Sequence, residues 1–178
     1  DAMTLAYALM MSTAVPAKGS NGVTASPRKQ GAGLVNVGAA VKAESYILMD
    51  ESSTDSAADG KVKAELGDDP ARTGKYTVSF SINNLTDAEL TYALSAEMFT
   101  QAPFTYYVNA DKSAEGYYMH TLTTEIGSTV EWTVNGVAAA DATAVVPASG
   151  KTTVVANIQL DADDKAAMDE CYANGAYV

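Results

Sequence analysis

Residues 75–83, KYTVSFSIN, decide the fold class, because apolar and polar side chains alternate along them. Successive side chains of a β-strand point to opposite faces, so a period of two predicts a strand with one face buried and the other in water. The apolar face of this expected strand consists of Tyr76, Val78, Phe80 and Ile82.

The same alternation recurs through the second half of the chain. It predicts strands at 90–98, 130–134 and 154–160, and shorter strands at 61–66, 104–109, 117–126 and 142–147. Between the strands lie pairs of residues that tolerate the positive φ of tight turns, at Asn83-Asn84, Asn135-Gly136 and Ser149-Gly150. Many short strands with turns between them and little helix predict a mainly β fold, an antiparallel β-sandwich.

The chain before residue 46 has a helical character instead. We expect a helix over 2–14, a connecting loop rich in Pro, Gly and Ser over 15–30, and a small helix capped by Asn36 that ends near residue 43. The acidic stretch 50–60 has no hydrophobic period and is typical of a linker or an exposed loop. We therefore place a boundary near residues 44–48.

This boundary predicts two units, residues 1–45 and 46–178. Near the end of the second unit, DADDKAAMDECY (161–172) predicts one short helix capped by Asp161. The closing NGAYV (174–178) looks like the start of another strand.

The helix expected over 2–14 is apolar around nearly its whole circumference. A helix on the surface of a domain normally keeps a polar face toward water. Nothing in the following thirty residues could surround this helix, so we expect its packing partner to lie outside the chain. The stretch resembles a signal-peptide core, but it starts with an acid and lacks a basic leader, which favours a folded helix.

Composition disfavours several classes of partner. The 178 residues are 47% hydrophobic and 19% charged, as is typical of a folded globular chain. With 22 acidic and 11 basic side chains the formal net charge is −11, so nucleic acid and anionic membranes would be repelled. No apolar stretch reaches the roughly 20 residues that span a bilayer. We therefore expect no nucleic-acid partner and no membrane span.

The two close glycines of SPRKQGAGLVNV (26–37) suggest a phosphate-binding loop. A dinucleotide loop requires G-x-G-x-x-G after a strand, whereas Gly31 and Gly33 are followed by Asn36 at the third position and no strand precedes them. A tight turn at which two chain segments approach closely explains both glycines better.

No catalytic set can be assembled from the side chains present. His120 is the one histidine, and on its expected strand it shares a side with apolar residues, which favours a packing role. Without a plausible base no serine triad is complete. Cys171, the one cysteine, excludes a disulfide within the chain, and the acidic residues before it disfavour a reactive thiolate.

Acidic pairs are plentiful, at Asp68-Asp69, Asp163-Asp164 and Asp169-Glu170. Such pairs in polar loops or at helix starts are commonly solvated or complement a helix dipole, so a glycosidase pair is disfavoured. A calcium loop would need alternating ligands around a central glycine. That spacing is missing from the acids of the linker region, Asp50, Glu51, Asp55 and Asp59.

Tyrosine pairs at Tyr106-Tyr107 and Tyr117-Tyr118 could form a binding face, although alternation assigns one of each pair to the core. Taken together, the side chains predict no catalytic residue, no cofactor-binding residue, no metal ligand and no cofactor. Calcium binding by a parent protein stays open.

Three linked segments resemble a known family. LMMSTAVP (9–16) followed by SPRKQGAGLVNVGAAV (26–41) is similar to the closing part of the subtilisin-like serine protease domain, especially in bacterial cell-envelope proteinases of the lactocepin and complement-cleaving peptidase type. In that family a helix ending in Met-Ser-Thr-Ala precedes a loop, and a Gln-Gly-Ala-Gly turn leads into a last helix. The matching segments are 9–14, 26–33 and 34–41.

The resemblance implies that residues 1–45 are a short helical remnant of a subtilisin-like α/β domain and that 46–178 form a fibronectin type III-like β-sandwich. It also implies that the catalytic residues are absent. The family's nucleophile lies in a Gly-Thr-Ser-Met segment and its base in a His-Gly-Thr segment, and neither occurs here. Ser12 and Ser26 do not fill that role.

The function that the resemblance implies is a non-catalytic part of a secreted or cell-wall-attached serine endopeptidase. Its partners would be the rest of the protease domain and protein substrates. Two alternatives stay open: a surface adhesin or carbohydrate-binding sandwich whose exposed tyrosines stack on sugars, and a purely structural spacer.

Overall fold

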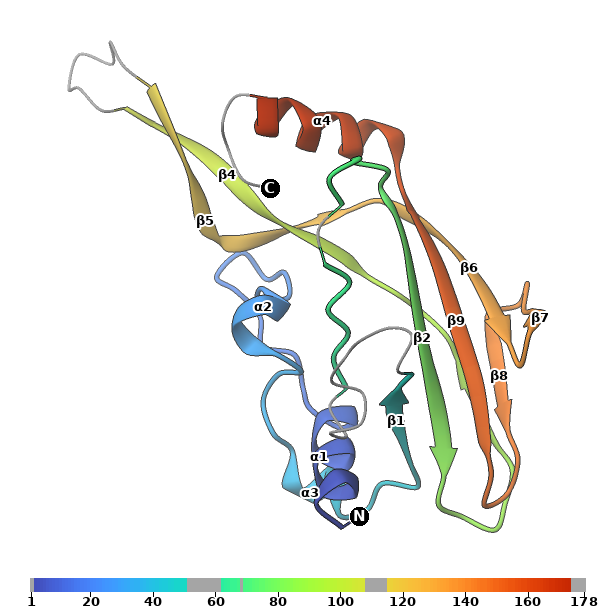
Figure 1. Cartoon of the computed structure of the whole chain (residues 1–178). Coiled ribbons are helices and arrows are strands. Elements are labelled where there is room, and N and C mark those ends of the chain that lie inside the picture. The colour runs from blue at the N-terminus through green and yellow to red at the C-terminus, as the bar shows by residue number, and fades with distance from the viewer. Residues whose placement is uncertain (1, 51–61, 68, 108–114, 174–178) are drawn as a thin grey trace.

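The structure is mainly β, with antiparallel sheets and few helices (Figure 1). The computed structural model describes residues 2–50, 62–67, 69–107 and 115–173, and within these ranges the side chains at 101–107, 115–122 and 171–172 are not described. The predicted mainly β, antiparallel fold class is confirmed.

The largest sheet has five strands in the order β1-β2-β9-β6-β7, and every neighbouring pair is antiparallel. The strands are β1 (Ser45–Met49), β2 (Lys75–Asn84), β6 (Ser128–Val134), β7 (Val137–Ala138) and β9 (Lys151–Leu160). Residues 75–83, which show the clearest alternation, lie within β2. It lies beside β9, with Phe80 opposite Val154 and Ile82 opposite Thr152.

The alternation of β9 predicts its buried face correctly. Its apolar positions are buried, and they are Val154, Ala156, Ile158 and Leu160. In β2 the polar face is less exposed than expected, because Ser81 is buried and Ser79 is half-buried. Ser79 Oγ donates a hydrogen bond to the Asp50 carboxylate at the end of β1.

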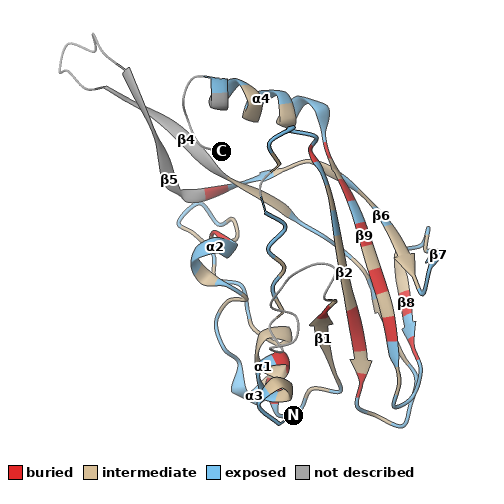
Figure 2. Cartoon of the chain, in the orientation of Figure 1, coloured by how far each residue is buried: buried red, intermediate tan, exposed pale blue. Residues whose placement is uncertain are grey.

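A second sheet pairs β3 (Leu90–Ala93) with β8 (Thr143–Val146), and a core lies between it and the large sheet. Ala144 and Val146 of β8 are fully buried against Ile82 and Val154. Phe80, Tyr92, Leu94, Trp132 and Val134 surround this cluster. Figure 2 shows the buried residues concentrated on β2, β8 and β9.

A third, two-stranded sheet is a long hairpin made of β4 (Met98–Tyr107) and β5 (Glu115–Ile126), which we call the arm. Figure 1 shows its distal end extending beyond α2 and the large sheet. The single strand expected over 90–98 is therefore wrong. The chain leaves β3 at Leu94, whose N–H donates to Ala142 O, and β4 turns away to pair with β5.

Other expectations are also corrected. Residues 62–67 form no strand, although alternation predicted one over 61–66. Asn83-Asn84 is not a turn but the end of β2, because the Asn84 amide is buried and bonds to the chain around it. By contrast, Asn135, Gly136 and Ser149 adopt positive φ as expected.

Three helices precede the large sheet: α1 (Ala2–Ser12), α2 (Pro27–Gln30) and α3 (Val37–Ala40). The structure confirms α1 and the Asn36 cap of α3, whose side chain accepts a hydrogen bond from Ala39 N at 3.0 Å. Helix α2 lies in the stretch that was expected to be only a loop. We call residues 2–44 the N-terminal segment.

The last helix, α4 (Ala162–Ala173), starts one residue after Asp161, as expected. Asp161 O accepts the first helical hydrogen bond, from Lys165 N at 2.9 Å. None of the helices that the structure describes is long and apolar enough to cross a membrane.

Candidate functional site

The glycine-rich stretch is a site of close backbone approach. Val15 and Leu34 exchange two backbone hydrogen bonds, of 2.9 Å and 2.8 Å, and Gly33 sits beside them with φ at 116°. A Cβ on Gly33 would lie 2.5 Å from Val15 O, so only glycine fits. The predicted close approach of two segments is confirmed, and the stretch presents packed backbone instead of a cradle for phosphate.

The residue that organises this loop is Gln30, which sequence reasoning missed. Its Oε1 accepts from Ala17 N at 2.7 Å, and its Nε2 donates to Ala25 O at 2.6 Å. Ala25 N also donates to Ala17 O at 2.8 Å, so the Gln30 amide adds two hydrogen bonds to the backbone pairing of these residues. The only available signal was its place within the Gln-Gly-Ala-Gly turn.

Ser12 and Ser26, which the sequence analysis did not assign as nucleophiles, both make local contacts. Ser12 Oγ accepts a hydrogen bond from Ile47 N at 2.9 Å, so it satisfies an N–H on the outer edge of β1. Ser26 is buried just before α2, and its backbone carbonyl accepts from Lys29 N and Gln30 N. Both act in the local structure.

The N-terminal segment exposes a set of large apolar side chains, which we call the N-terminal apolar residues. They are Met3, Tyr7, Val15, Leu34, Val35, Val37 and Val41. Met3 is 63% exposed and Val41 76%, whereas Ala8 is the fully buried residue of α1. Seven exposed large apolar side chains within one short segment make this segment a candidate interface.

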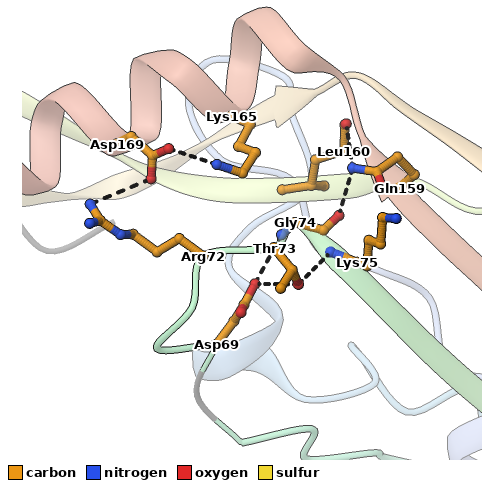
Figure 3. Close-up of polar contacts among 9 residues, drawn as sticks. All are labelled: Asp69, Arg72, Thr73, Gly74, Lys75, Gln159, Leu160, Lys165 and Asp169. Carbon is orange, nitrogen blue, oxygen red and sulfur yellow. Dashed lines mark hydrogen bonds and ion pairs between the residues drawn. The ribbon is translucent and has the colours of Figure 1, made fainter.

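A polar cluster joins α4 to the start of β2 (Figure 3). Asp69 Oδ2 accepts from Gly74 N at 2.9 Å and from Thr73 Oγ1 at 3.1 Å. Asp169 pairs with Lys165 at 2.7 Å and with Arg72 at 3.7 Å. The ion pair between Arg72 and Asp169 links the loop before β2 to the helix after β9, while the hydrogen bonds of Asp69 lie within the loop.

A shallow hollow of about 250 Å³ lies next to this loop. Tyr76, Asp69 and Lys75 line it together with Leu66, Gly67, Pro70 and Thr77. Backbone hydrogen bonds from Thr73 and Gly74 lower the pKa of Asp69 below its usual 3.8. Burial, and then the nearby Asp69 charge, raise the pKa of Tyr76 above its usual 10.0, so the phenol stays protonated and cannot act as a base near neutral pH.

The acidic residues do not gather into a metal site within the described ranges, where no group of three or more His, Cys, Asp or Glu could hold an ion. Asp164 Oδ2 accepts from Gly127 N at 2.6 Å, and Asp50 accepts from Ser79. The other acids of the calcium hypothesis, Glu51, Asp55 and Asp59, lie outside the described residues, as does Asp68.

The remaining candidates lie on elements whose side chains are not described. His120 belongs to β5 and Cys171 to α4, so the packing role predicted for His120 and the unreactive thiol predicted for Cys171 stay predictions. The backbone register places Tyr106 opposite Gly116, Tyr117 opposite Thr105 and Tyr118 opposite Phe104. The two tyrosine pairs thus flank the same end of the arm.

No family model and no curated protein matches this chain.

Proposed function

We propose that this chain is a non-catalytic part of a secreted or cell-envelope subtilisin-like serine endopeptidase. Residues 1–45 would complete the protease domain, and residues 46–178 would form a fibronectin type III-like sandwich that supports it. The proposal starts from the three segments that resemble the end of a subtilisin-like domain.

The observation that carries the proposal is the contrast in burial between the two parts. The N-terminal apolar residues are exposed, whereas Ile82 of β2, Val146 of β8 and Val154 of β9 are buried in a core between the sheets. The core of a protein–protein interface is apolar, so it is exposed when the partner domain is absent. Exposed apolar side chains beside a domain with its own core are consistent with such an interface. A catalytic domain resting on α1 and α3 would cover that surface.

The contacts between the two parts support a rigid connection. Ile47 N donates to Ser12 Oγ, and Asn21 Nδ2 donates to Thr123 O at 3.0 Å across 102 residues of sequence. Thr123 Oγ1 also donates to Thr24 O. A sandwich fixed in this way to the last helices of a protease domain would hold its orientation relative to that domain.

The proposal is tested at the level of the gene and of the protein. The reading frame upstream of Asp1 is expected to encode the His-Gly-Thr and Gly-Thr-Ser-Met segments. The purified chain is expected to remain unlabelled by a fluorophosphonate probe, whereas the longer product is labelled at its serine. Labelling of the 178-residue chain, or an upstream frame without these segments, would overturn the proposal.

A second candidate function is carbohydrate binding, and the register of the arm favours it. Tyr106, Tyr107, Tyr117 and Tyr118 flank one end of the hairpin, where aromatic rings could stack on sugars. A glycan array separates the two functions. Reproducible binding that is lost on Tyr107→Ala or Tyr117→Ala would favour the adhesin.

A further inference from the structure

The N-terminal segment holds the arm at Thr123 of β5. This threonine is buried, with 2% of its surface exposed. Its carbonyl accepts a hydrogen bond from Asn21 Nδ2 at 3.0 Å, and its hydroxyl donates to Thr24 O. The two bonds join residues that are 102 and 99 positions apart in sequence. We call Asn21, Thr24 and Thr123 the latch.

The loop that carries Asn21 and Thr24 is closed by its own contacts. Lys18 and Thr24 form an isolated antiparallel bridge across the loop. Asn21 Oδ1 accepts from Val23 N at 3.2 Å, so one end of the amide is bound within the loop while the other end reaches Thr123. A loop shaped in advance loses little conformational entropy when it holds another element.

Two short segments connect the arm to the sheets. Residues 95–97, between β3 and β4, are exposed and belong to no helix or strand. Gly127 alone separates β5 from β6. Its N–H donates to Asp164 Oδ2 at 2.6 Å and its carbonyl accepts from Asp161 N at 2.9 Å, so the start of α4 holds this connection. A Cβ on Gly127 would clash with the Asp161 carboxylate.

The latch lies beside an irregular point of the hairpin. Gln101 of β4 is opposite Thr123, and the register shifts between Gln101 and Pro103. A strand bends where its ladder is interrupted, and a two-stranded ribbon is marginally stable by itself. The N-terminal segment therefore bonds to the arm at a place where the arm needs support against bending.

We propose that the latch fixes the direction of the arm relative to the sheets. When Thr123 loses its two hydrogen bonds, the arm swings about Gly127 and residues 95–97. An arm held in one direction is preorganised for contacts at its distal end. The proposal goes beyond the proposed function, because it concerns motion within the chain and stands whether or not the chain accompanies a protease.

Pulsed electron paramagnetic resonance on the full chain measures the direction of the arm. Spin labels are attached at Thr105→Cys in β4 and Glu131→Cys in β6, and Cys171→Ser removes the native thiol. An intact latch is expected to give one narrow distribution of distances between the labels. Asn21→Asp with Thr123→Val removes both donors with little change of shape, and it should widen the distribution at least about twofold.

A matched control adds the same charge and the same side chain at neighbouring exposed positions. Ser20→Asp with Thr124→Val leaves both latch bonds in place and should keep the narrow distribution. An equal widening in this control would overturn the proposal, because the change would then follow from the added charge or the lost hydroxyl alone.

Hydrogen exchange covers the case in which the latch variant unfolds more widely. Amides of the arm near the latch, at 98–101 and 123–126, should exchange at least about tenfold faster in the Asn21→Asp, Thr123→Val variant. Amides of β9 should change less than about twofold. Equal acceleration in β9 would show that Thr123 supports the whole fold, and this result overturns the proposal.

Two further results would also overturn it: an unchanged distance distribution in the latch variant, or a broad distribution while the latch is intact. Fluorophosphonate labelling bears only on the proposed function, so the two proposals can fail separately.

Discussion

The sheet region, residues 75–160, and the N-terminal segment differ in how fully they bury large apolar side chains, although the sheet region also exposes Leu85, Val137 and Val145. In the sheet region Val146 and Val154 are fully buried between two sheets. In the N-terminal segment, valines of the same size lie in water, and Val41 is 76% exposed. The difference teaches that the two sheets enclose a core between them, whereas the buried apolar residues described in the N-terminal segment are the small side chains Ala8 and Ala40.

The largest loss of stability is expected on substitution of Asn84, which bonds to the chain around the closed core. Its buried amide donates to Ala88 O at 2.7 Å and to Pro147 O at 3.0 Å, and it accepts from Thr86 N at 2.8 Å. Asn84→Ala would leave these groups unpaired and lower the free energy of unfolding by about 3–4 kcal/mol. Urea denaturation measures the change.

The control for Asn84 is its neighbour Asn83, whose amide bonds to Ser81. Asn83→Ala should cost under about 1 kcal/mol. Equal losses at both positions would show that the Asn84 network does not hold β2 to β8.

Two valines test the comparison directly. Val154→Ala deletes methyl groups from the closed core and should cost about 2–3 kcal/mol in urea denaturation. Val41→Ala removes the same atoms from the surface and should change stability by less than about 0.5 kcal/mol. A large loss at Val41 would mean that the N-terminal segment depends on a core of its own.

Substituting glycines of the N-terminal segment should cost less stability than the core substitutions, and the change should stay local. Gly33→Ala places a Cβ against Val15 O and forces a strained φ, so the pairing of Val15 with Leu34 should weaken by about 2 kcal/mol. Faster hydrogen exchange at those two amides would report this opening. Gly31 also has positive φ but open space around its Cβ position, so Gly31→Ala should cost only roughly 1 kcal/mol.

The smallest effect is expected in acid, at the loop between the two parts of the chain. The pKa of Asp69 is lowered in the folded state, so the stability it contributes is present above the unfolded value of 3.8 and is lost as the pH falls through the folded pKa. Unfolding measured from about pH 6 downward should show a smaller acid loss in Asp69→Asn than in the unmodified chain. An unchanged acid profile would show that the hydrogen bonds at Asp69 do not favour its charged form.

Alternation of apolar and polar residues predicted side-chain burial correctly where a strand has one solvent-exposed face and one buried face. It predicted the buried positions of β9 and the apolar face of β2, because side-chain direction in a strand follows directly from residue number. Alternation failed at 61–66 and at 90–98, and turn chemistry failed at Asn83-Asn84. Whether an extended segment finds a partner strand, and whether an amide finds buried carbonyls, depends on residues distant in sequence.

For the candidate sites too, local spacing predicted some features and missed those that depend on distant residues. Sequence spacing excluded a dinucleotide loop at Gly31 and Gly33, and local backbone geometry agrees with that reading. It could not identify Gln30 as the residue that holds the loop, because its partners Ala17 and Ala25 are brought near only by folding. The boundary between residues 1–45 and 46–178, and the absence of catalytic residues, stay predictions.

The sequence by itself determined the fold class, the apolar first helix and the acidic charge, since each depends on residue type and on spacing within one element. Only the tertiary structure decided that β4 leaves the core to form the arm, that the N-terminal segment bonds to β5, and that its apolar residues face water. The physical reason is that strand pairing and burial depend on contacts between distant segments, and no local pattern contains them.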